Sequence, residues 1–165
     1  MPSPDAALLS PDHIALIDKG VSAIVASRDA GLRPSLMRAV GTTISADGRQ
    51  VTVFVSRSQS RQLLLDIAAT GEVAVVFSQP LSHRTVQLKG RRASLRPADD
   101  ADGPALRRYL ASMEEEIGAV GFGPPFVHAM FAHRLDDLVA IGFTPAEAYD
   151  QTPGARAGTA LPHPA

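Results

Sequence analysis

Hydrophobic and polar residues alternate with a period of two along several stretches of the chain, which is the pattern of half-buried β-strands. In residues 83–90, Val86 and Leu88 share one side of such a strand. The opposite side is polar and consists of His83, Thr85, Gln87 and Lys89. A polar face of this kind meets either open solvent or a bound polar ligand.

The same criterion, together with an enrichment in β-branched residues, predicts most of the remaining strands. The predicted strands cover residues 21–29, 34–45, 51–56, 72–78, 84–95 and 135–145. Asp47-Gly48 separates the second strand from the third and is a strong signal for a β-hairpin. The strands at 34–45 and 51–56 are therefore expected to pair.

Other stretches change to helical spacing. Ser10 and Pro11 provide an N-cap and a first helical residue, and Gly20 ends the helix that they start. Two further helices are indicated by apolar stripes and one by a proline-rich turn. The stripes are Leu63, Leu64, Ile67 and Ala68, ended by Gly71, and Leu106, Leu110, Met113 and Ile117, and the short helix is GPPFVHAMFA.

This order of elements predicts an α+β protein that is mainly β, with an antiparallel split β-barrel and peripheral helices. The domain is expected to cover residues 1–150. Residues 151–165 are rich in Gly, Pro and Ala, lack periodicity, and are expected to form an extended or mobile tail. A small open barrel leaves strand edges and apolar faces uncovered, so we expect a homodimer.

Composition excludes several classes of site. The chain of 165 residues has no cysteine, a net charge of −1 and five histidines without metal-binding spacing, so no metal site and no nucleic-acid partner are expected. No apolar stretch approaches the roughly 20 residues of a membrane span, and residues 1–12 lack an export signal, which favours the cytoplasm. GxGxxG, P-loop and GxSxG motifs are absent, so no catalytic residue is assigned.

Arginines and hydroxyls gather where the third strand meets the next helix, in SRSQSRQLL at residues 56–64. A helix N-terminus carries unpaired amide donors. Ser56, Ser58 and Ser60 add hydroxyls and Arg61 or Arg57 adds a charge, so this segment is a candidate phosphate site. The alternative is a serine cap beside solvated arginines.

Two further segments are candidates for the same ligand. Arg38 lies on the strand that precedes the Asp47-Gly48 hairpin, whose open end brings it toward the serine-rich turn. A lone strand arginine can instead lie along the surface. The polar side of residues 83–90 can line a groove for a flat ligand that forms hydrogen bonds, or it can face solvent.

The motifs RAVGTT, VFVSRSQSRQLL and HRTVQLKG, in this order of elements over residues 10–150, resemble the FMN-binding split-barrel family related to pyridoxamine 5'-phosphate oxidase. The resemblance implies a dimer with flavin at the interface. The residues that it implies for the site are Arg38, Ala39, Val40, Thr42, Thr43, Val55, Ser56, Ser60, Arg61, Gln62, Arg84, Thr85 and Gln87. Thr43 replaces the family's lysine, and Thr85 replaces a glutamine for which Gln87 can substitute.

The resemblance also implies an FMN-dependent oxidoreductase with a small-molecule substrate and reduced NAD(P)H as donor. The family's region that holds pyridoxamine phosphate has no counterpart in GARAGTALPHPA, so this substrate is not expected. Three alternatives remain. They are an F420-dependent reductase, a non-catalytic carrier of flavin or of haem (with His83, His128 or His133 as haem ligand), and a dimer without a ligand.

Overall fold

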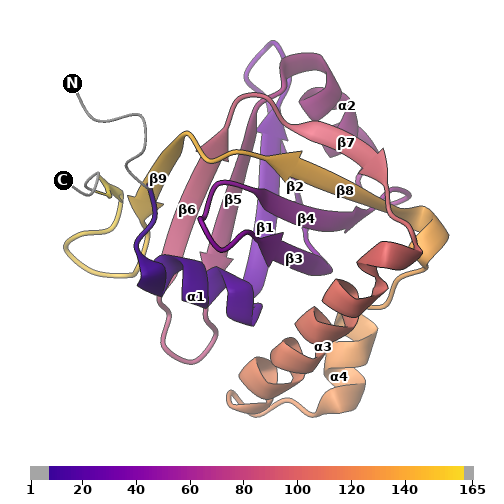
Figure 1. The fold of residues 1–165 in the computed structure, drawn as a ribbon, viewed down its shortest axis with the longest axis vertical. Coiled ribbons are helices and arrows are strands. Elements are labelled where there is room, and N and C mark those ends of the chain that lie inside the picture. Colours follow the sequence, from indigo (N-terminus) through magenta and orange to yellow (C-terminus); the bar gives the residue numbers. More distant parts are fainter. Residues whose placement is uncertain (1–7, 162–165) are drawn as a thin grey trace.

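The computed structural model describes residues 8–161, and the predictions that concern residues 1–7 and 162–165 lie outside this part. The described chain contains four α-helices and two antiparallel sheets (Figure 1). The helices are α1 (Pro11–Lys19), α2 (Arg61–Thr70), α3 (Gly103–Gly118) and α4 (Pro124–Met130), with short 3-10 turns at Asp100–Asp102 and Leu135–Asp137. The predicted α+β class is confirmed. None of the helices in residues 8–161 is both long and apolar enough to cross a bilayer.

The first sheet has six strands in the order β10-β9-β6-β5-β1-β2. Its strands are β1 (Ser22–Arg28), β2 (Pro34–Arg38), β5 (Val73–Ser78), β6 (Thr85–Gly90), β9 (Glu147–Asp150) and β10 (Thr159–Ala160). The second sheet has four strands in the order β3-β4-β8-β7. Its strands are β3 (Gly41–Ile44), β4 (Val51–Ser56), β7 (Ser94–Pro97) and β8 (Leu138–Phe143). The two sheets face each other without closing into one barrel (Figure 1).

Two predicted strands are wrong as single elements, because each divides between the two sheets. Residues 34–45 break at Ala39–Val40 into β2 and β3, and residues 84–95 break after Gly90 into β6 and β7. A period-two pattern continues through such a crossing because both halves have one buried side. Only the segment 41–44, and not the whole predicted strand, pairs with β4.

Residues 151–161 also differ from the predicted tail. The Gln151 N–H donates to the Thr85 carbonyl (2.9 Å), and Thr159–Ala160 pair with β9 as strand β10. The Leu161 N–H then donates to the Ala148 carbonyl (2.9 Å). These bonds are formed by backbone groups, which a side-chain pattern does not report.

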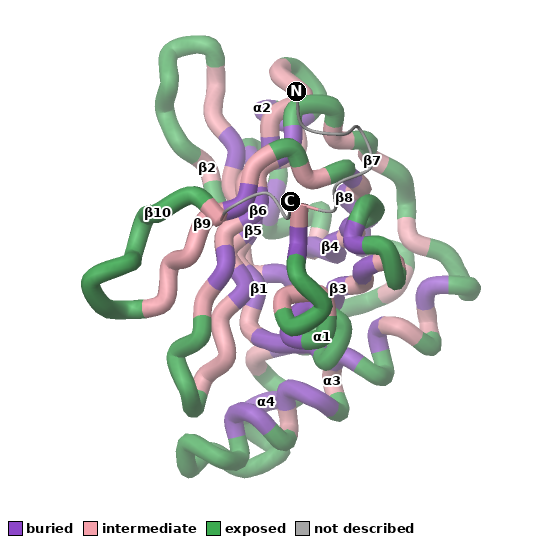
Figure 2. Tube along the Cα trace, turned by 60° about the vertical axis from the view of Figure 1, so that its left-hand side comes forward, coloured by how far each residue is buried: buried purple, intermediate pink, exposed green. Residues whose placement is uncertain are grey.

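The core has two parts, one on each side of the four-stranded sheet. The part between the sheets is filled by side chains such as Val25, Val75 and Leu88 from one sheet and Val53 and Ile141 from the other. The second part lies between the four-stranded sheet and the α3–α4 pair and consists of Val40, Phe54, Leu106, Tyr109, Met113, Ile117, Val127, Phe131, Leu138 and Ala140. Figure 2 shows buried positions alternating along the strands, whereas many connecting loops are exposed. The four-stranded sheet is thus covered on both faces.

The predicted helix ends are confirmed where the chain carries their signals. The Ser10 side chain accepts from the His13 N–H (3.3 Å) at the start of α1, and Pro11 follows it. Gly71 ends α2 in the left-handed conformation, with φ of 70°. A Cβ at Gly71 would lie 2.8 Å from the Arg91 carbonyl oxygen, so both conformation and space require glycine there.

Substitution of Gly71 by Ala is expected to lower the free energy of unfolding by about 1–3 kcal/mol, because it combines an unfavourable φ with a contact to rigid backbone. Urea denaturation followed by circular dichroism measures the change. Gly118→Ala is the control, since Gly118 ends α3 and a Cβ added there would meet no neighbouring atom within 4 Å. Equal stability of the two variants would contradict the assignment.

Candidate functional site

One face of the six-stranded sheet lacks a covering helix and is partly exposed. Residues that pair across antiparallel strands point to the same side. The register places Arg38 beside Ile24, Ile24 beside Val76, Val76 beside Gln87 and Gln87 beside Tyr149, which forms one row across five strands. A parallel row contains Leu36, Ala26, Ala74, Lys89 and Glu147. We call these two rows the outer face.

The outer face has an apolar centre and a polar rim. Ile24, Val76, Ala26 and Ala74 occupy its middle at intermediate exposure, and Leu36 on the edge strand is 63% exposed. The predicted alternation of β6 is confirmed, because Val86 and Leu88 are buried while Thr85, Gln87 and Lys89 lie on the less buried side. His83 is an exception, since it lies in the β5–β6 turn with φ of 60° and not on the strand. Arg84 precedes the strand and is exposed.

The predicted site segments meet at the crossing between the sheets. The Ala39 N–H donates to the Ala23 carbonyl in the six-stranded sheet (2.9 Å), and the Val40 N–H donates to the Phe54 carbonyl in the four-stranded sheet (2.8 Å). The chain from Arg38 to Thr43 is thereby held beside β4, the strand that leads into the serine-rich turn and α2. The backbone of residues 40–43 thus lies beside β4, whereas the Arg38 side chain lies on the outer face, on the other side of β2 from Ser35 and α2.

Several of the predicted residues are too buried to offer their side chains to a ligand. Ala39 and Val55 are fully buried, and Val40 is 8% exposed. Thr42 shares the inner side of its sheet with Val53, and its buried hydroxyl has no hydrogen-bond partner among the described residues. These residues can meet a ligand only through backbone groups. Thr43 faces the opposite side and is less buried.

Arg38 lies at the end of β2, on the outer face. Its Nη1 atom donates to the Ser22 hydroxyl (3.2 Å) on the neighbouring strand. Burial raises the pKa of the Tyr109 phenol on α3 well above its usual value. The positive charge of Arg38 opposes this shift but is the smaller effect. The Tyr109 hydroxyl donates to the Val21 carbonyl (2.9 Å), so α3 fixes the end of β1 that carries Ser22.

Helix α2 begins with donors that its own cap does not satisfy. Ser60 takes the N-cap position, but its side chain forms no capping bond, and its buried hydroxyl has no partner among the described residues. Arg61 and Gln62 follow and are exposed. Gln62 donates to one oxygen of Asp66 (2.8 Å), and the Ser35 hydroxyl of β2 donates to the other (2.6 Å), which ties α2 to β2.

The Ser56–Ser58 turn has a partner that the sequence did not reveal. Both hydroxyls donate to Asp137 Oδ2, with 2.7 Å for Ser58, and the Ser58 N–H donates to Oδ1 (3.1 Å). These hydrogen bonds, those from the two hydroxyls first, hold the pKa of Asp137 below its usual value. The Ser56 hydroxyl therefore already donates its hydrogen bond within the protein. No local motif could indicate this partner, because Asp137 is 81 residues away in the sequence.

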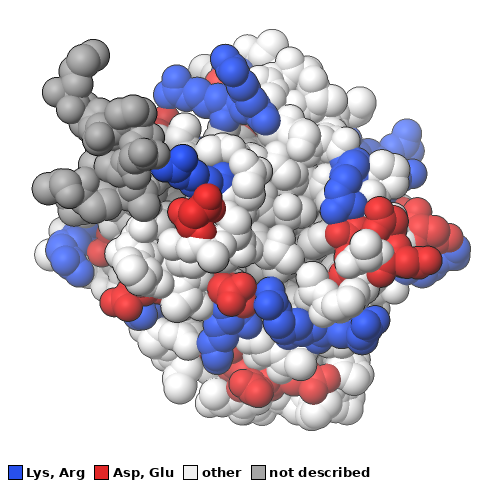
Figure 3. Space-filling view, in the orientation of Figure 1, with Lys and Arg blue, Asp and Glu red and all other residues white. Residues whose placement is uncertain are grey.

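Arg38 and the polar residues of β6 do not meet within one chain. The register separates Arg38 from Gln87 by three strand spacings, through Ile24 and Val76. At the usual strand spacing, the backbones of Arg38 and Gln87 are therefore about 14 Å apart. Both polar side chains of β6 also form hydrogen bonds within the chain. The Thr85 hydroxyl bonds to the Ser78 hydroxyl (2.8 Å), and the Gln87 side-chain oxygen accepts from the Gln151 amide (3.3 Å). Basic and acidic side chains are interspersed over the face of the molecule shown in Figure 3.

Solved structures with the same fold include pyridoxamine 5'-phosphate oxidase-like proteins. HupZ of Group A Streptococcus is 15% identical, with a TM-score of 0.54 over 91% of this chain and 99% of HupZ. A putative pyridoxamine 5'-phosphate oxidase of Lactobacillus delbrueckii is also 15% identical, with a TM-score of 0.53 over 90% and 97% of the two chains. An F420 reductase is 16% identical, with a TM-score of 0.54 over 85% and 98%.

No family profile matches the chain, and no curated protein is similar to it in sequence. The resemblance that the sequence motifs indicated is thus confirmed in the fold, which is that of the pyridoxamine 5'-phosphate oxidase-like split barrels.

The hydrogen bonds to Asp137 predict a specific pH dependence. A carboxyl whose pKa is lower in the folded state stabilises the fold above its unfolded pKa of about 3.9, and this contribution is lost as the pH falls through the folded value. Asp137→Asn should therefore lower the free energy of unfolding at neutral pH and differ less from wild type at about pH 3.

Urea titrations across this pH range measure the effect. The Ser56→Ala/Ser58→Ala double variant should reproduce it, since it removes the same hydrogen bonds from the other side. A difference from wild type that stays constant with pH would contradict this assignment.

Proposed function

We propose that the protein is an FMN-binding flavoprotein that acts as a dimer. The observation that carries the proposal is the crossing at Ala39–Val40, which holds the end of β2 with Arg38 beside the strand that leads into α2. A ligand at this crossing would have an arginine and an uncapped helix N-terminus on neighbouring segments. The combination suits a phosphate monoester, which carries about two negative charges at neutral pH.

The residues at the start of α2 fit such a phosphate. The first amide groups of a helix have no intrahelical acceptor and lie at the positive end of its dipole. Ser60 adds a buried hydroxyl that has no partner within residues 8–161, and Arg61 adds an exposed guanidinium. Arg38 would complete the charge by leaving the neutral Ser22 hydroxyl on the outer face and turning past the end of β2 to the anion.

The flavin ring would lie against residues 39–43 and 83–87. The backbone carries this contact at Ala39, Val40, Thr42 and Val55, because their side chains are buried. Since Thr85 and Gln87 lie three strands away from Arg38 in the same chain, we propose that they, with Arg84, reach the ring from a second copy. The uncovered apolar centre of the outer face would be buried by the same association.

When bound, FMN supplies hydride and single-electron transfer. The chain would hold the phosphate through Arg38, Ser60 and Arg61 and present backbone N–H groups of 39–43 to the ring edge. We propose reduced NAD(P)H as the electron donor and a small molecule other than pyridoxamine phosphate as the substrate, in the cytoplasm. F420 and haem are the alternative ligands.

FMN and riboflavin together test the phosphate site, because they differ only in the phosphate group. Wild type is expected to bind FMN more tightly, and Arg38→Gln and Arg61→Gln should each weaken FMN by about 1.5–3 kcal/mol, roughly 10- to 150-fold in Kd. Riboflavin binding should be unchanged in both variants. Quenching of flavin fluorescence measures the affinities of wild type and variants for both compounds.

Arg33→Gln provides a matched control, since Arg33 is exposed in the β1–β2 turn. Equal affinities of wild type for FMN and riboflavin would refute the phosphate site. A Soret band with haem or tight binding of F420, without FMN binding, would replace FMN by that ligand. Reduction of bound flavin by NADH or NADPH separates an enzyme from a carrier.

The dimer is tested by placing a charge at the centre of the outer face. Val76→Glu should convert a dimer into a monomer, because an unpaired carboxylate would be buried at the interface. Light scattering coupled to size exclusion measures the mass. Leu65→Glu is the control, because Leu65 is 64% exposed on α2, which packs on the other side of the sheet. A wild-type monomer would refute the dimer.

A further inference from the structure

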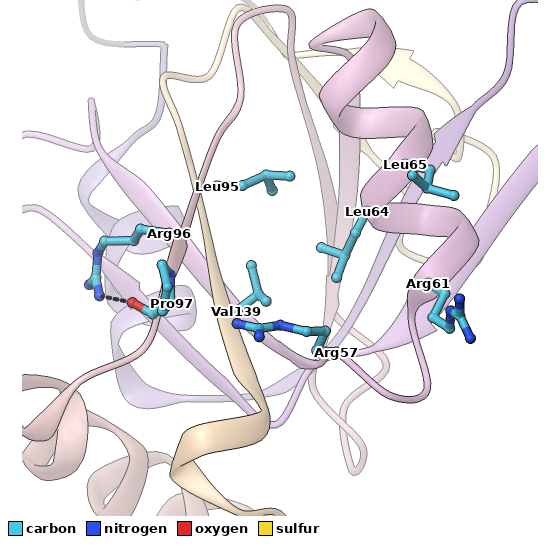
Figure 4. A pocket seen from close by; sticks show the side chains of 8 residues that line it. All are labelled: Arg57, Arg61, Leu64, Leu65, Leu95, Arg96, Pro97 and Val139. Carbon is cyan, nitrogen blue, oxygen red and sulfur yellow. Dashed lines mark hydrogen bonds between the residues drawn. The ribbon is translucent and has the colours of Figure 1, made fainter.

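A pocket lies on the opposite flank of α2 from β2. It has a volume of about 400 Å³ and opens between α2, β7 and β8. Its walls are mostly apolar, formed by Leu64 of α2, Leu95 and Pro97 of β7, and Val139 of β8. Figure 4 shows Leu64 and Leu95 pointing into the space above Val139, and Leu65 and Arg61 line the pocket from further along α2.

Arg57 is one of three arginines that line this pocket, with Arg61 and Arg96. Figure 4 shows its side chain extending beneath Val139 in the direction of Pro97. Its backbone is fixed, because the Arg57 N–H donates to the Asp137 carbonyl (2.6 Å). The Asp137 carboxylate accepts its hydrogen bonds from the serine turn, and the positive charge of Arg57 adds a smaller contribution to its lowered pKa. No carboxylate of residues 8–161 lies in direct ion-pair contact with Arg57.

The other two arginines that line the pocket differ in their partners. Arg96 is neutralised by Asp102 through two bonds of 2.7 Å, which is a bidentate pair. Arg61 lines the pocket from the start of α2. The pocket therefore combines an apolar interior with two guanidinium groups, those of Arg57 and Arg61, that form no ion pair in the part of the chain that the structure describes.

Helix geometry places the apolar part of this pocket apart from the proposed flavin site, and Arg61 lies at the border of the two. Successive residues of an α-helix are rotated by about 100°, so Leu64 points roughly opposite to Gln62. Gln62 and Asp66 face β2 through the bond from Ser35, whereas Leu64 faces β7. A molecule against Leu64 and Arg57 would lie on one flank of α2, and one bound beside β2 would lie on the other.

We propose that this pocket binds a small amphipathic carboxylate, with its apolar part against Leu64, Leu95 and Val139 and its carboxylate on Arg57. The volume lies within the range of small-molecule sites, about 300–1,000 Å³, and a mostly apolar wall with one charged group is typical of them. A guanidinium matches a carboxylate with two parallel hydrogen bonds. A phosphate ester with a polar body would leave the apolar walls unmatched.

Decanoate and its neutral counterpart 1-decanol test the proposal by isothermal titration calorimetry. Wild type is expected to bind decanoate at least about tenfold more tightly than decanol, because only the acid forms a charge-assisted bond with Arg57. Arg57→Gln should remove this preference, and Arg57→Lys should keep part of it. Leu64→Trp should abolish binding of both compounds by filling the pocket.

Controls keep this test independent of flavin binding. Arg33→Gln should bind decanoate like wild type, and thermal denaturation checks that the Arg57 and Leu64 variants are folded. FMN affinity should be unchanged in Arg57→Gln, so that a failure of either site is seen separately. Equal affinity of wild type for decanoate and decanol, or unchanged decanoate affinity in Arg57→Gln, would overturn the proposal.

Discussion

The structure depends on one dipeptide that belongs to both sheets. Ala39 and Val40 are adjacent, yet the N–H of the first donates to the six-stranded sheet and that of the second to the four-stranded sheet. Both side chains are buried, one in the core between the sheets and the other beneath α3. Because buried amides need partners, this crossing fixes how the two sheets are oriented, and with them every segment of the candidate site.

The serine-rich turn shows how a protein can satisfy its own polar groups before any ligand arrives. Asp137 accepts hydrogen bonds from two serine hydroxyls and one amide, which fixes the turn ahead of α2. The carboxylate also places a negative charge next to the turn, and the two arginines that flank the turn, Arg57 and Arg61, both line the pocket beside α2.

The two sheets differ in how they are covered, and this difference organises the proposed function. The four-stranded sheet is buried on both faces, so β8 reads as a nearly continuous apolar run. The six-stranded sheet has a buried inner face and a partly exposed outer face with an apolar centre. An open apolar strip of this kind favours association, and association is also what would bring the polar end of β6 toward Arg38.

The sequence by itself determined the local structure. Alternation located β1, β4, β5 and β8, capping residues located the ends of α1 and α2, and the motifs around Arg38 and Ser60 identified the fold. Local signals suffice there because strand and helix periods and caps are formed by neighbouring residues.

Tertiary structure alone decided where each strand belongs. The two divided strands, the pairing of β10, the bonds of Asp137 to Ser56 and Ser58, and the pocket beside Arg57 all depend on groups far apart in the chain. A period-two pattern records only that one side of a strand is buried, and it does not record which sheet buries it. Contacts between distant segments are set by packing and by backbone hydrogen bonds, which leave no local trace in the order of residues.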